Sequence, residues 1–595
     1  MKEKSETKRS AKPLLTDTEL QEIVRKIALI NAVKHDGKAQ EGAVIGKILG
    51  EKPELRSKVE KISTLIRNVV REVNGLSPEK QKRMVEEKWP EALVREKVEE
   101  EKHLPPLPNV DKYAFVVTRF SPNPDCVLHL GSARAIILCH EYARFYKGKF
   151  ILRFEDTDPK IKRPVLEFYD RIRADLAWIN CRPDEEYIQS DRIPIYYEYA
   201  EKLLKDGNAY VCTCQPQLFR EKALANQPCE CRFLPAEENM LRWKRMLQGE
   251  YGEGKAVVRV KTDMNHPNPA VRDWPALRIV DTDKFPHPRV GNKYRVWPLY
   301  NLANGIDDHL LGITHIIRGK EHLTNQVRQE YMYKHLGWKY PEAIHYGRLK
   351  ITGASLSKSK IVQGIKDGLY KDWNDPRLAT FAALRRRGIT PEAIRKMIID
   401  VGPKTQDVVL SWENLYAYNR KILDPVTERY FFVENPIELM VEEIPKAFNV
   451  KLLLHPSHPE GRSREYLIKP EQGNGNAKFW VSKKDVDASK IGSIVRLMEL
   501  FNVKIKNASV YAAEAVFESE SYEQARRMKA QLIHWIPVGR DMPCQVIMQD
   551  ASVVEGIAES YCKQLKPDAI IQFERYGFVR IDQVEGKLTA YYAHK

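Results

Sequence analysis

The stretch YAFVVTRFSPNPDCVLHLGSARAIILCHEYARFYKGKFILRF, residues 113–154, decides the fold. Its opening residues, 113–120, are rich in aromatic and β-branched side chains, which favours a strand. A proline-rich turn at 121–124 follows, and from about Gly131 the pattern is that of a helix. Residues 150–154 form the next predicted strand. Because strand–helix–strand is the unit of a parallel sheet, this stretch predicts an α/β domain.

The turn between the first strand and the helix carries a candidate phosphate site. In residues 119–132 a strand runs through a turn into a helix N-terminus, whose unpaired N–H groups suit phosphate. His129 can donate a hydrogen bond to a phosphate oxygen, and Gly131 leaves room for a flat base against its backbone. An ordinary strand–helix turn with a chance histidine is the alternative.

A second candidate phosphate site is the small polar loop SLSKSK, residues 355–360. Lys358 and Lys360 are free in such a loop to clamp a triphosphate. Taken alone, the segment is better explained as a solvated basic loop. The hypothesis therefore depends on the two sites occurring together.

As a pair, the two segments resemble the two signatures of class I aminoacyl-tRNA synthetases. Longer stretches narrow the resemblance to glutamyl-tRNA synthetases of the archaeal/eukaryotic form, over residues 16–595. These stretches include FILRFEDTDP, SDRIPIYYEYAEKL, YNLANGIDDHLLGITHIIRGKEHL, NAVKHDGKAQEGAVIGKILGEKPELR, QLIHWIPVG and IIQFERYGFVRID. One departure is Ser132, where the family's first signature often ends in histidine. A hydroxyl can donate a hydrogen bond but cannot carry charge.

The resemblance implies a multidomain chain around an α/β class I Rossmann-like catalytic domain. The expected parts are an N-terminal helical tRNA-associated domain (1–105), the first half of the catalytic domain (106–211), an inserted acceptor-stem-binding domain (212–297), the second half of the catalytic domain with the SLSKS loop (298–375), a helical connecting domain (376–425) and all-β anticodon-binding barrels (426–595). Helical periodicity supports the first part, with helices ending near Gly37 and Gly75 and a third capped by Ser77. Helical patterning is also expected near 319–335 and 375–421.

The resemblance also implies a reaction: ATP-dependent ligation of L-glutamate to tRNA(Glu) through a glutamyl-adenylate. The protein then has to align the reactants and stabilise negative charge on the phosphates. The residues implied in catalysis are His129 and Lys358, and those implied in ATP binding are His129, Gly131, Ser132, Lys358 and Lys360. Mg²⁺ is expected with ATP, although the sequence offers no dedicated cage for an ion that usually keeps several waters.

Glutamate binding requires a guanidinium for a carboxylate and an acid for the ammonium group. Arg119, Glu155 and Arg318 lie near the carboxyl ends of predicted strands, where doubly wound sheets bind ligands. Tyr300 and Asn304, one helical turn apart, match pocket positions of the family. The complete expected set is Arg119, Ser121, Glu155, Tyr300, Asn304 and Arg318.

Arg318 distinguishes glutamyl-tRNA synthetases from the similar glutaminyl-tRNA synthetases. Glutaminyl-tRNA synthetases resemble this chain but lack an arginine at the matching position, and a neutral amide would leave the guanidinium charge poorly compensated. The sequence therefore favours glutamate. A tRNA-binding synthetase-like protein without catalysis and a generic adenylyltransferase are further alternatives. A generic adenylyltransferase would not need the helical prefix or the β-rich tail.

Four cysteines form two pairs in the predicted insertion: Cys212, Cys214, Cys229 and Cys231. Four thiolates suit a tetrahedral structural Zn²⁺, although C-x-C is tighter than the usual C-x-x-C spacing. The family resemblance supports a zinc site, since some family members have a cysteine-rich zinc site in this insertion. Reduced, metal-free cysteines are the alternative. Clustered cysteines in a long chain favour reduced, metal-binding thiols in the cytosol over a framework of disulfide bonds.

Short β-rich runs begin near Arg429 and predict antiparallel barrels or a sandwich. By resemblance this tail reads the tRNA anticodon, whose single-stranded bases are splayed onto aromatic or arginine side chains. Most aromatic residues of the tail, such as Phe479, Trp535 and Phe573, are better explained as core positions. Arg575 is harder to bury and is the predicted tRNA-binding residue.

Composition bounds these hypotheses. The 595-residue chain has a net charge of +16, which suits a polyanionic partner, although a solvated basic surface is an equal alternative. No apolar run is long enough to cross a membrane, and the polar N-terminus lacks the apolar stretch of a signal peptide. We therefore expect a cytoplasmic protein with tRNA, glutamate and ATP as partners and no membrane association. No protein partner is predicted.

Overall fold

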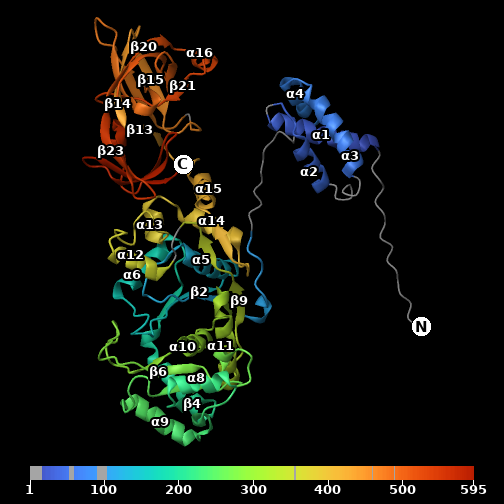
Figure 1. The fold of residues 1–595 in the computed structure, drawn as a ribbon, viewed down its shortest axis with the longest axis vertical. Coiled ribbons are helices and arrows are strands. Elements are labelled where there is room, and N and C mark those ends of the chain that lie inside the picture. The colour runs from blue at the N-terminus through green and yellow to red at the C-terminus, as the bar shows by residue number, and fades with distance from the viewer. Residues whose placement is uncertain are drawn as a thin grey trace. The chain divides into compact units, whose positions relative to one another are not determined.

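The computed structural model describes residues 17–35, 37–51, 59–89, 103–353, 357–458, 460–487 and 490–595. The chain forms two compact units, residues 1–101 and 102–595, coloured along the chain in Figure 1. Part of the predicted loop, Ser355 and Leu356, lies outside the described residues, as does the predicted N-terminal tail. No described helix is long and apolar enough to cross a membrane.

The first unit is helical, as predicted. Its helices are α1 (Asp17–Lys34), α2 (Glu41–Glu51), α3 (Val59–Asn74) and α4 (Pro78–Lys88). Val24, Ile66 and Val85 are buried between them. Ser77 caps α4 by accepting a hydrogen bond from the Lys80 N–H, 3.3 Å away, which confirms the predicted cap. The sequence did not predict α2, whose three glycines lower its helix propensity.

A parallel sheet forms the centre of the second unit and confirms the predicted α/β class. Strands β1 (Val117–Phe120), β2 (Lys149–Phe154) and β3 (Glu185–Ile188) pair in the order β1-β2-β3. Strands β8 (His315–Gly319) and β9 (Glu342–Tyr346) form a second parallel pair. Thr314, just before β8, exchanges hydrogen bonds with Val117, so β8 lies beside β1.

The first strand is shorter than predicted. Strand pairing begins only at Val117, opposite Lys149, where β2 starts. Residues 113–116 therefore lie outside the sheet, although Val116 O still accepts a hydrogen bond from the Lys149 N–H at 2.9 Å. A Cβ at Gly148 would stand 1.8 Å from that carbonyl oxygen, so glycine is required for this close approach.

Helices α5 (Leu130–Phe145) and α6 (Leu166–Trp178) pack on the parallel sheet. Helices α7 (Ile193–Lys205), α10 (Tyr300–Leu310) and α11 (Leu323–Leu336) share a buried core with the strands of the predicted insertion. Ile136, Ile137 and Leu138 of α5 pack with Phe150 and Leu152 of β2 in one buried core. The apolar side chains of the deciding stretch thus build the platform for the loops at the strand ends.

The predicted insertion folds around an antiparallel sheet. Its strands are β4 (Ala209–Cys212), β5 (Val257–Val260), β6 (Pro275–Ile279) and β7 (Val296–Pro298), with helices α8 (Pro216–Leu224) and α9 (Ala236–Gln248). The strand order is β4-β5-β6-β7. Buried Trp243, Trp274 and Trp297 dominate its core, and its elements lie together in green in Figure 1.

The region predicted as helical over 375–421 also contains a strand. Helices α12 (Lys358–Lys366), α13 (Phe381–Arg386), α14 (Pro391–Val401) and α15 (Trp412–Leu423) are capped at three starts by Thr380, Thr390 and Ser411. Between the last two helices, β11 (Val408–Leu410) pairs in parallel with β10 (Leu349–Ile351). The partner strand lies far away in sequence, so local periodicity could not reveal it.

The C-terminal part is β-rich, as predicted. One seven-stranded sheet has the order β12-β25-β26-β27-β23-β24-β13 and the other β21-β18-β19-β20-β14-β17-β22, with β15 and β16 as a separate hairpin. The strands are β12 (Arg429–Tyr430), β13 (Phe432–Glu434), β14 (Pro436–Glu442), β15 (Phe448–Leu453), β16 (Ser463–Ile468), β17 (Ala477–Ser482), β18 (Ile494–Leu497), β19 (Asn502–Ala508), β20 (Ala512–Ser519), β21 (Gln531–Ile533), β22 (Ile536–Pro537), β23 (Asp541–Ile547), β24 (Val553–Glu559), β25 (Ile570–Phe573), β26 (Gly577–Gln583) and β27 (Leu588–His594). Each sheet encloses a separate hydrophobic core.

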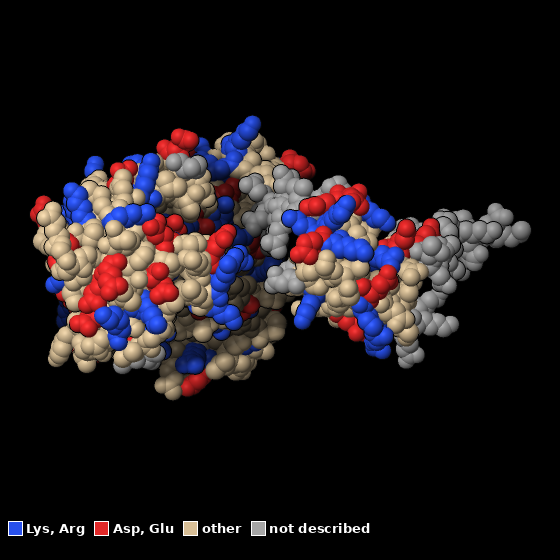
Figure 2. Space-filling view, turned by 90° about the horizontal axis from the view of Figure 1, so that it is seen from above, with Lys and Arg blue, Asp and Glu red and all other residues tan. Residues whose placement is uncertain are grey.

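The surface does not separate charge by sign on the face that Figure 2 shows. Lysine and arginine side chains lie among acidic ones there. Ion pairs between such residues occur in the second unit, as between Arg173 and Glu186 and between Lys149 and Glu185. On this face the positive charge of the chain, +16 in total, is therefore spread among acidic residues and does not form one basic patch.

Candidate functional site

A cavity of about 690 Å³ opens at the carboxyl ends of β1, β2 and β8. Five of the six residues predicted to bind glutamate line it: Arg119, Ser121, Glu155, Tyr300 and Arg318. They come from three strands or strand ends and from the first turn of α10. Parallel strands bring such distant residues to one edge of the sheet, where ligands of this architecture bind.

Arg318 lies within β8, one residue before its end, near the carboxyl end of a strand as predicted. Its guanidinium is held by three neutral groups. Nη1 donates to Gln329 Oε1 at 3.2 Å, Nη2 donates to the Tyr340 hydroxyl at 2.9 Å, and Nε donates to His345 Nε2 at 3.4 Å. Burial, with the nearby arginine, lowers the pKa of His345 to about 4, so this ring is neutral at neutral pH. The arginine keeps its positive charge available to the cavity.

Arg119 is tied to an acidic residue that the sequence analysis did not select. Its Nε and Nη2 donate to the two oxygens of Asp308 at 3.1 and 3.3 Å, and both side chains are buried. Burial alone would lower the pKa of Arg119, but the Asp308 carboxylate more than offsets this and raises it. Arg119 therefore enters the cavity wall as a fixed, fully charged group.

Glu155 follows β2 and belongs to the same charged cluster. Arg153 Nη2 donates to Glu155 at 3.1 Å, and Arg153 Nη1 donates to Asp308 at 2.7 Å. Burial raises the pKa of Glu155 although the two arginines oppose this. The arginine at 153 was not predicted, since a charged residue inside an apolar strand has no sequence pattern of its own.

Asn304 contacts the cavity through Glu155. It lies one turn after Tyr300 in α10, and its Nδ2 donates to the Glu155 carboxylate. Its Oδ1 accepts from Gln329 Nε2 at 3.3 Å. Asn304 is therefore placed to orient the acid of the predicted ammonium site.

The His129 turn has the predicted strand–turn–helix form. His129 is the N-cap of α5, and its Nδ1 accepts a hydrogen bond from the Gly131 N–H at 3.0 Å. The proton of the neutral ring must then be on Nε2, which is left as a donor. Burial lowers the pKa of His129, which favours this neutral form. Ser132 lies in the first turn of the same helix and is half-buried.

The structure brings the second predicted phosphate loop to the first. Lys358 begins α12, and its Nζ lies 2.5 Å from Oδ2 of Asp125, in the turn after β1. Lys360 is exposed on the same helix. The backbone also connects the regions: Leu130 N–H donates to Ala379 O at 2.9 Å.

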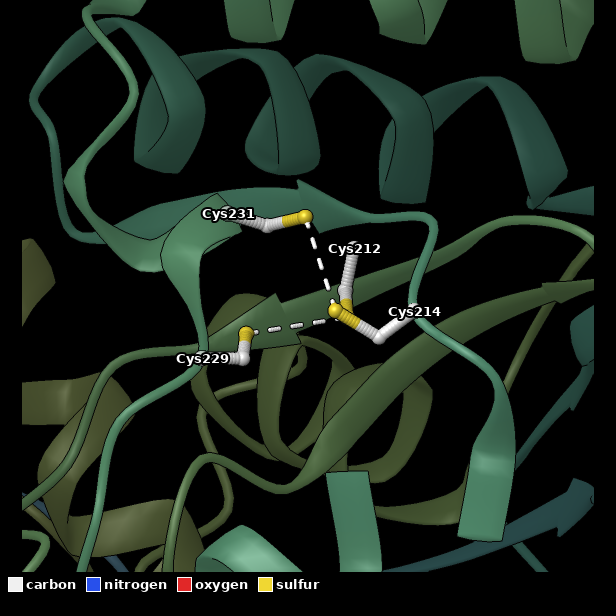
Figure 3. A group of neighbouring side chains, drawn as sticks. All are labelled: Cys212, Cys214, Cys229 and Cys231. Carbon is white, nitrogen blue, oxygen red and sulfur yellow. Dashed lines mark hydrogen bonds between the residues drawn. The ribbon is translucent and has the colours of Figure 1, made fainter. Parts of the chain in front are cut away.

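The four predicted cysteines form one cluster at the end of β4 (Figure 3). Cys212 and Cys229 have their sulfurs 3.8 Å apart, as have Cys214 and Cys231. All four sulfurs lie within 4.8 Å of one another. A tetrahedral zinc with bonds of about 2.3 Å needs sulfurs about 3.8 Å apart, so this donor set fits the ion.

Neighbouring groups lower the pKa of Cys229 and Cys231, whereas the hydrogen bond with Cys229 raises the pKa of Cys212 and burial raises that of Cys214. A hydrogen bond from the Cys212 thiol is the largest cause that lowers the pKa of Cys229, to about 5. Arg242 Nη1 donates to the Cys231 sulfur at 3.6 Å. Thiolate is the form that coordinates metal.

In the C-terminal part, Arg575 lines a smaller cavity of about 130 Å³ together with Ser482 and His534. Arg575 is exposed, and its Nη1 donates to Leu532 O. Ser482 Oγ and His534 Nε2 are buried without a hydrogen-bond partner among the described residues. By contrast Phe479, Trp535 and Phe573 are fully buried, which confirms that they are core residues. Such unsatisfied polar atoms beside an arginine suit a polar ligand.

Family models match nearly all of the second unit. The catalytic domain of class I tRNA synthetases (E and Q) matches residues 115–425, and two anticodon-binding domains of the same group match residues 427–521 and 532–582. The first match includes the cavity and both phosphate loops. The chain therefore belongs to the glutamate and glutamine group of class I tRNA synthetases.

Full-length relatives narrow the assignment. Glutamate–tRNA ligases of Pyrococcus furiosus and Pyrococcus abyssi are 53% and 54% identical to it, each over 97% of this chain and 100% of the relative. The glutamate–tRNA ligase of Caldivirga maquilingensis is 46% identical over 97% of this chain and 99% of the relative. Within its class, the chain belongs to the glutamate–tRNA ligase family.

Proposed function

We propose that this chain ligates L-glutamate to tRNA(Glu) with ATP. In the first step a carboxylate oxygen of glutamate attacks the α-phosphorus of ATP, and the bond to the leaving pyrophosphate breaks. In the second step a terminal ribose hydroxyl of the tRNA attacks the acyl carbon of the glutamyl-adenylate, and AMP leaves. No protein nucleophile is needed, so alignment and charge stabilisation supply the catalysis.

One observation carries the proposal: the same cavity is lined by Arg318, which forms no ion pair with an acid among the described residues, and by the Glu155 carboxylate. Arg318 is held by neutral groups, and Glu155 accepts from Asn304. Glutamate has complementary charges, with carboxylates for the guanidiniums and an ammonium group for the acid. Arg119, Ser121 and Tyr300 complete the wall around it.

The choice of glutamate over glutamine follows from Arg318. Its three hydrogen bonds go to a glutamine, a tyrosine and a histidine, none of which neutralises its charge. A side-chain carboxylate of the substrate would do so, whereas an amide would leave the charge uncompensated. The full-length glutamate–tRNA ligase relatives also argue against the glutaminyl alternative.

His129 and Lys358 are proposed to act on the phosphates of ATP. The Nε2–H of His129 can donate to a phosphate oxygen, and Lys358 can place a positive charge beside it. The proposed ATP site further includes Gly131, Ser132 and Lys360, with Lys360 reaching the phosphates only if its exposed side chain folds inward. Among the described residues, the cysteines form the one cluster suited to a metal, so Mg²⁺ would be held mainly by the phosphates and water.

The cysteine cluster is proposed to bind one structural Zn²⁺. The 3.8 Å sulfur separations support this, and the four thiols would leave no open position for catalysis. The site would tie β4 to the short helix at Glu230–Phe233. A reducing, cytoplasmic setting would keep the thiols available.

The two β-rich sheets are proposed to read the anticodon. Arg575, with the unsatisfied Ser482 and His534 in one small cavity, offers hydrogen bonds to a base edge. No chemistry is assigned to this part of the chain.

The test is to charge purified glutamate and glutamine tRNAs with labelled glutamate and with labelled glutamine. Ester formation with glutamate on tRNA(Glu) is expected. Exclusive use of glutamine would overturn the amino-acid assignment. Tight tRNA binding without any charging would favour a synthetase-like protein that lacks catalysis.

A further inference from the structure

Gln329 joins the two charged ends of the cavity. It lies in α11 with its side chain fully buried. Its Oε1 accepts from Arg318 Nη1 at 3.2 Å and from the Tyr340 hydroxyl at 2.7 Å. Its Nε2 donates to Asn304 Oδ1 at 3.3 Å. Every polar atom of this amide is thus used within the protein.

The hydrogen bonds run in one direction through the two amides. Of the two polar atoms of the Gln329 amide, only the oxygen can accept from the Arg318 guanidinium, so the amide must present its NH₂ group to Asn304. Asn304 must then accept through Oδ1, and its own NH₂ group donates to the Glu155 carboxylate. A donor at one end of the cavity is linked to an acceptor at the other through two neutral side chains.

From this chain of contacts we infer that Gln329 is a specificity-determining and positioning residue. It fixes the guanidinium of Arg318 without neutralising it, and through Asn304 it sets the position of Glu155. The inference rests on the proposed function, in which these two groups bind the side-chain carboxylate and the ammonium group of glutamate. Gln329 itself is fully buried and does not line the cavity, so it acts through these two groups.

The neutrality of residue 329 is the point that can be tested. A carboxylate in its place would form an ion pair with Arg318 and would compensate the charge that selects the substrate carboxylate. It would also lose the donor to Asn304, which frees Asn304 to turn away from Glu155. Glutamate would then lose its advantage, while a neutral glutamine side chain would no longer face an uncompensated charge.

The experiment compares Gln329→Glu with Gln329→Met and the wild type, all as full-length chains. For each, kcat/KM is measured for charging with glutamate and with glutamine, together with the KM for ATP. For Gln329→Glu, the preference for glutamate over glutamine should fall by about tenfold to a hundredfold, the effect of one charge-assisted hydrogen bond. The loss should appear mainly in the KM for glutamate, with an unchanged KM for ATP.

Gln329→Met is the matched control, since it has similar length and no charge. It should weaken glutamate use at least about tenfold but keep the preference for glutamate, because Arg318 stays uncompensated. A folded Gln329→Glu enzyme with wild-type preference would overturn the inference. If that variant does not fold, an unchanged KM for glutamate in Gln329→Met would overturn it instead. A wild-type enzyme that does not charge glutamate would refute the proposed function, which is a separate outcome.

Discussion

Nζ of Lys358 lies 2.5 Å from Oδ2 of Asp125, so the helix that begins at Lys358 is paired with the turn that leads to His129. The two phosphate loops are far apart in sequence, yet they face the same region. The ion pair between them holds the lysine beside the turn that leads to His129. ATP phosphates would compete with Asp125 for this lysine.

This arrangement predicts different roles for two neighbouring lysines. Lys358→Ala should lower the rate of ATP–pyrophosphate exchange, measured with tRNA present, by about a hundredfold or more, because a charge beside the reacting phosphate is lost. Lys360→Ala is the matched control, since its side chain is exposed, and should change the rate by less than about tenfold. Equal effects of the two substitutions would contradict the assignment of Lys358.

Removing the guanidinium of Arg318 should abolish efficient glutamate use. Breaking a buried charged pair on one side costs about 3–5 kcal/mol, so kcat/KM for glutamate in Arg318→Ala should fall by orders of magnitude. The KM for ATP, taken from the same assay, should change little. Near wild-type charging of glutamate by this variant would show that the pocket has been assigned wrongly.

The Arg119–Asp308 pair predicts a pH-dependent stability. Burial would raise the pKa of Asp308, but Arg119 and Arg153 more than offset this and lower it. A carboxyl group with a lowered folded-state pKa stabilises the fold above its unfolded pKa of about 3.9, and this contribution disappears as pH falls through the folded-state pKa. Asp308→Asn should therefore destabilise the protein by about 3–5 kcal/mol at neutral pH and by progressively less below about pH 4.

Thermal unfolding of the variant and the wild type at several pH values measures this difference. Asp568→Asn serves as the control, because Asp568 is exposed and its partner Arg580 keeps a second acid, Asp582. A surface pair contributes about 0–1 kcal/mol, so that variant should unfold close to the wild type. A pH-independent difference for Asp308→Asn would count against the ion pair.

The cysteine cluster predicts a metal content. Freshly reduced protein, purified without chelators, should contain about one Zn²⁺ per chain by elemental analysis. Replacing Cys212 and Cys229 by serine should remove the metal and increase proteolysis of the insertion. Cys126→Ser is the control, because Cys126 lies outside the cluster and should retain the metal. Absence of metal in the wild-type protein would refute the site.

The small cavity at Arg575 predicts a loss of anticodon discrimination. Arg575→Ala should reduce the preference for native tRNA over an anticodon variant by about 1–3 kcal/mol, the usual value of one base contact. Charging rates on the two tRNAs measure it. Arg540→Ala, an exposed arginine in the same region, should leave the preference unchanged. If both variants discriminate as well as the wild type, Arg575 does not read a base.

The sequence predicted the ends of the pocket better than its interior. Arg119, Glu155 and Arg318 could be selected because each stands at or near the end of an apolar run, where strand ends meet. Arg153 and Asp308 could not, because their burial depends on pairing between segments far apart in the chain. Gln329 lies on a helix of mixed polarity, and its fully buried position is visible only once α10 and α11 are packed together.

The elements of the fold also divide into those that local sequence predicts and those that depend on distant contacts. The parallel sheet, the helical prefix and most C-terminal strands follow local periodicity and were predicted. The pairing of β10 with β11 was not predicted, because it depends on a partner strand far away in sequence. Helix α2 was not predicted, because its formation depends on packing that compensates for three glycines.

The bond between Val117 and Thr314 spans 197 residues, with the insertion between the two. During synthesis, β1, β2 and β3 therefore leave the ribosome long before β8 exists to join them. The cysteines at 212–231 and the insertion's own strands emerge in that interval and have mostly local partners. Because contacts close in sequence form fastest, the insertion should fold as a unit while one edge of the catalytic sheet is still exposed. This edge is where a nascent chain would misassemble, and a stalled translation product ending before residue 315 should be aggregation-prone even though its insertion is native.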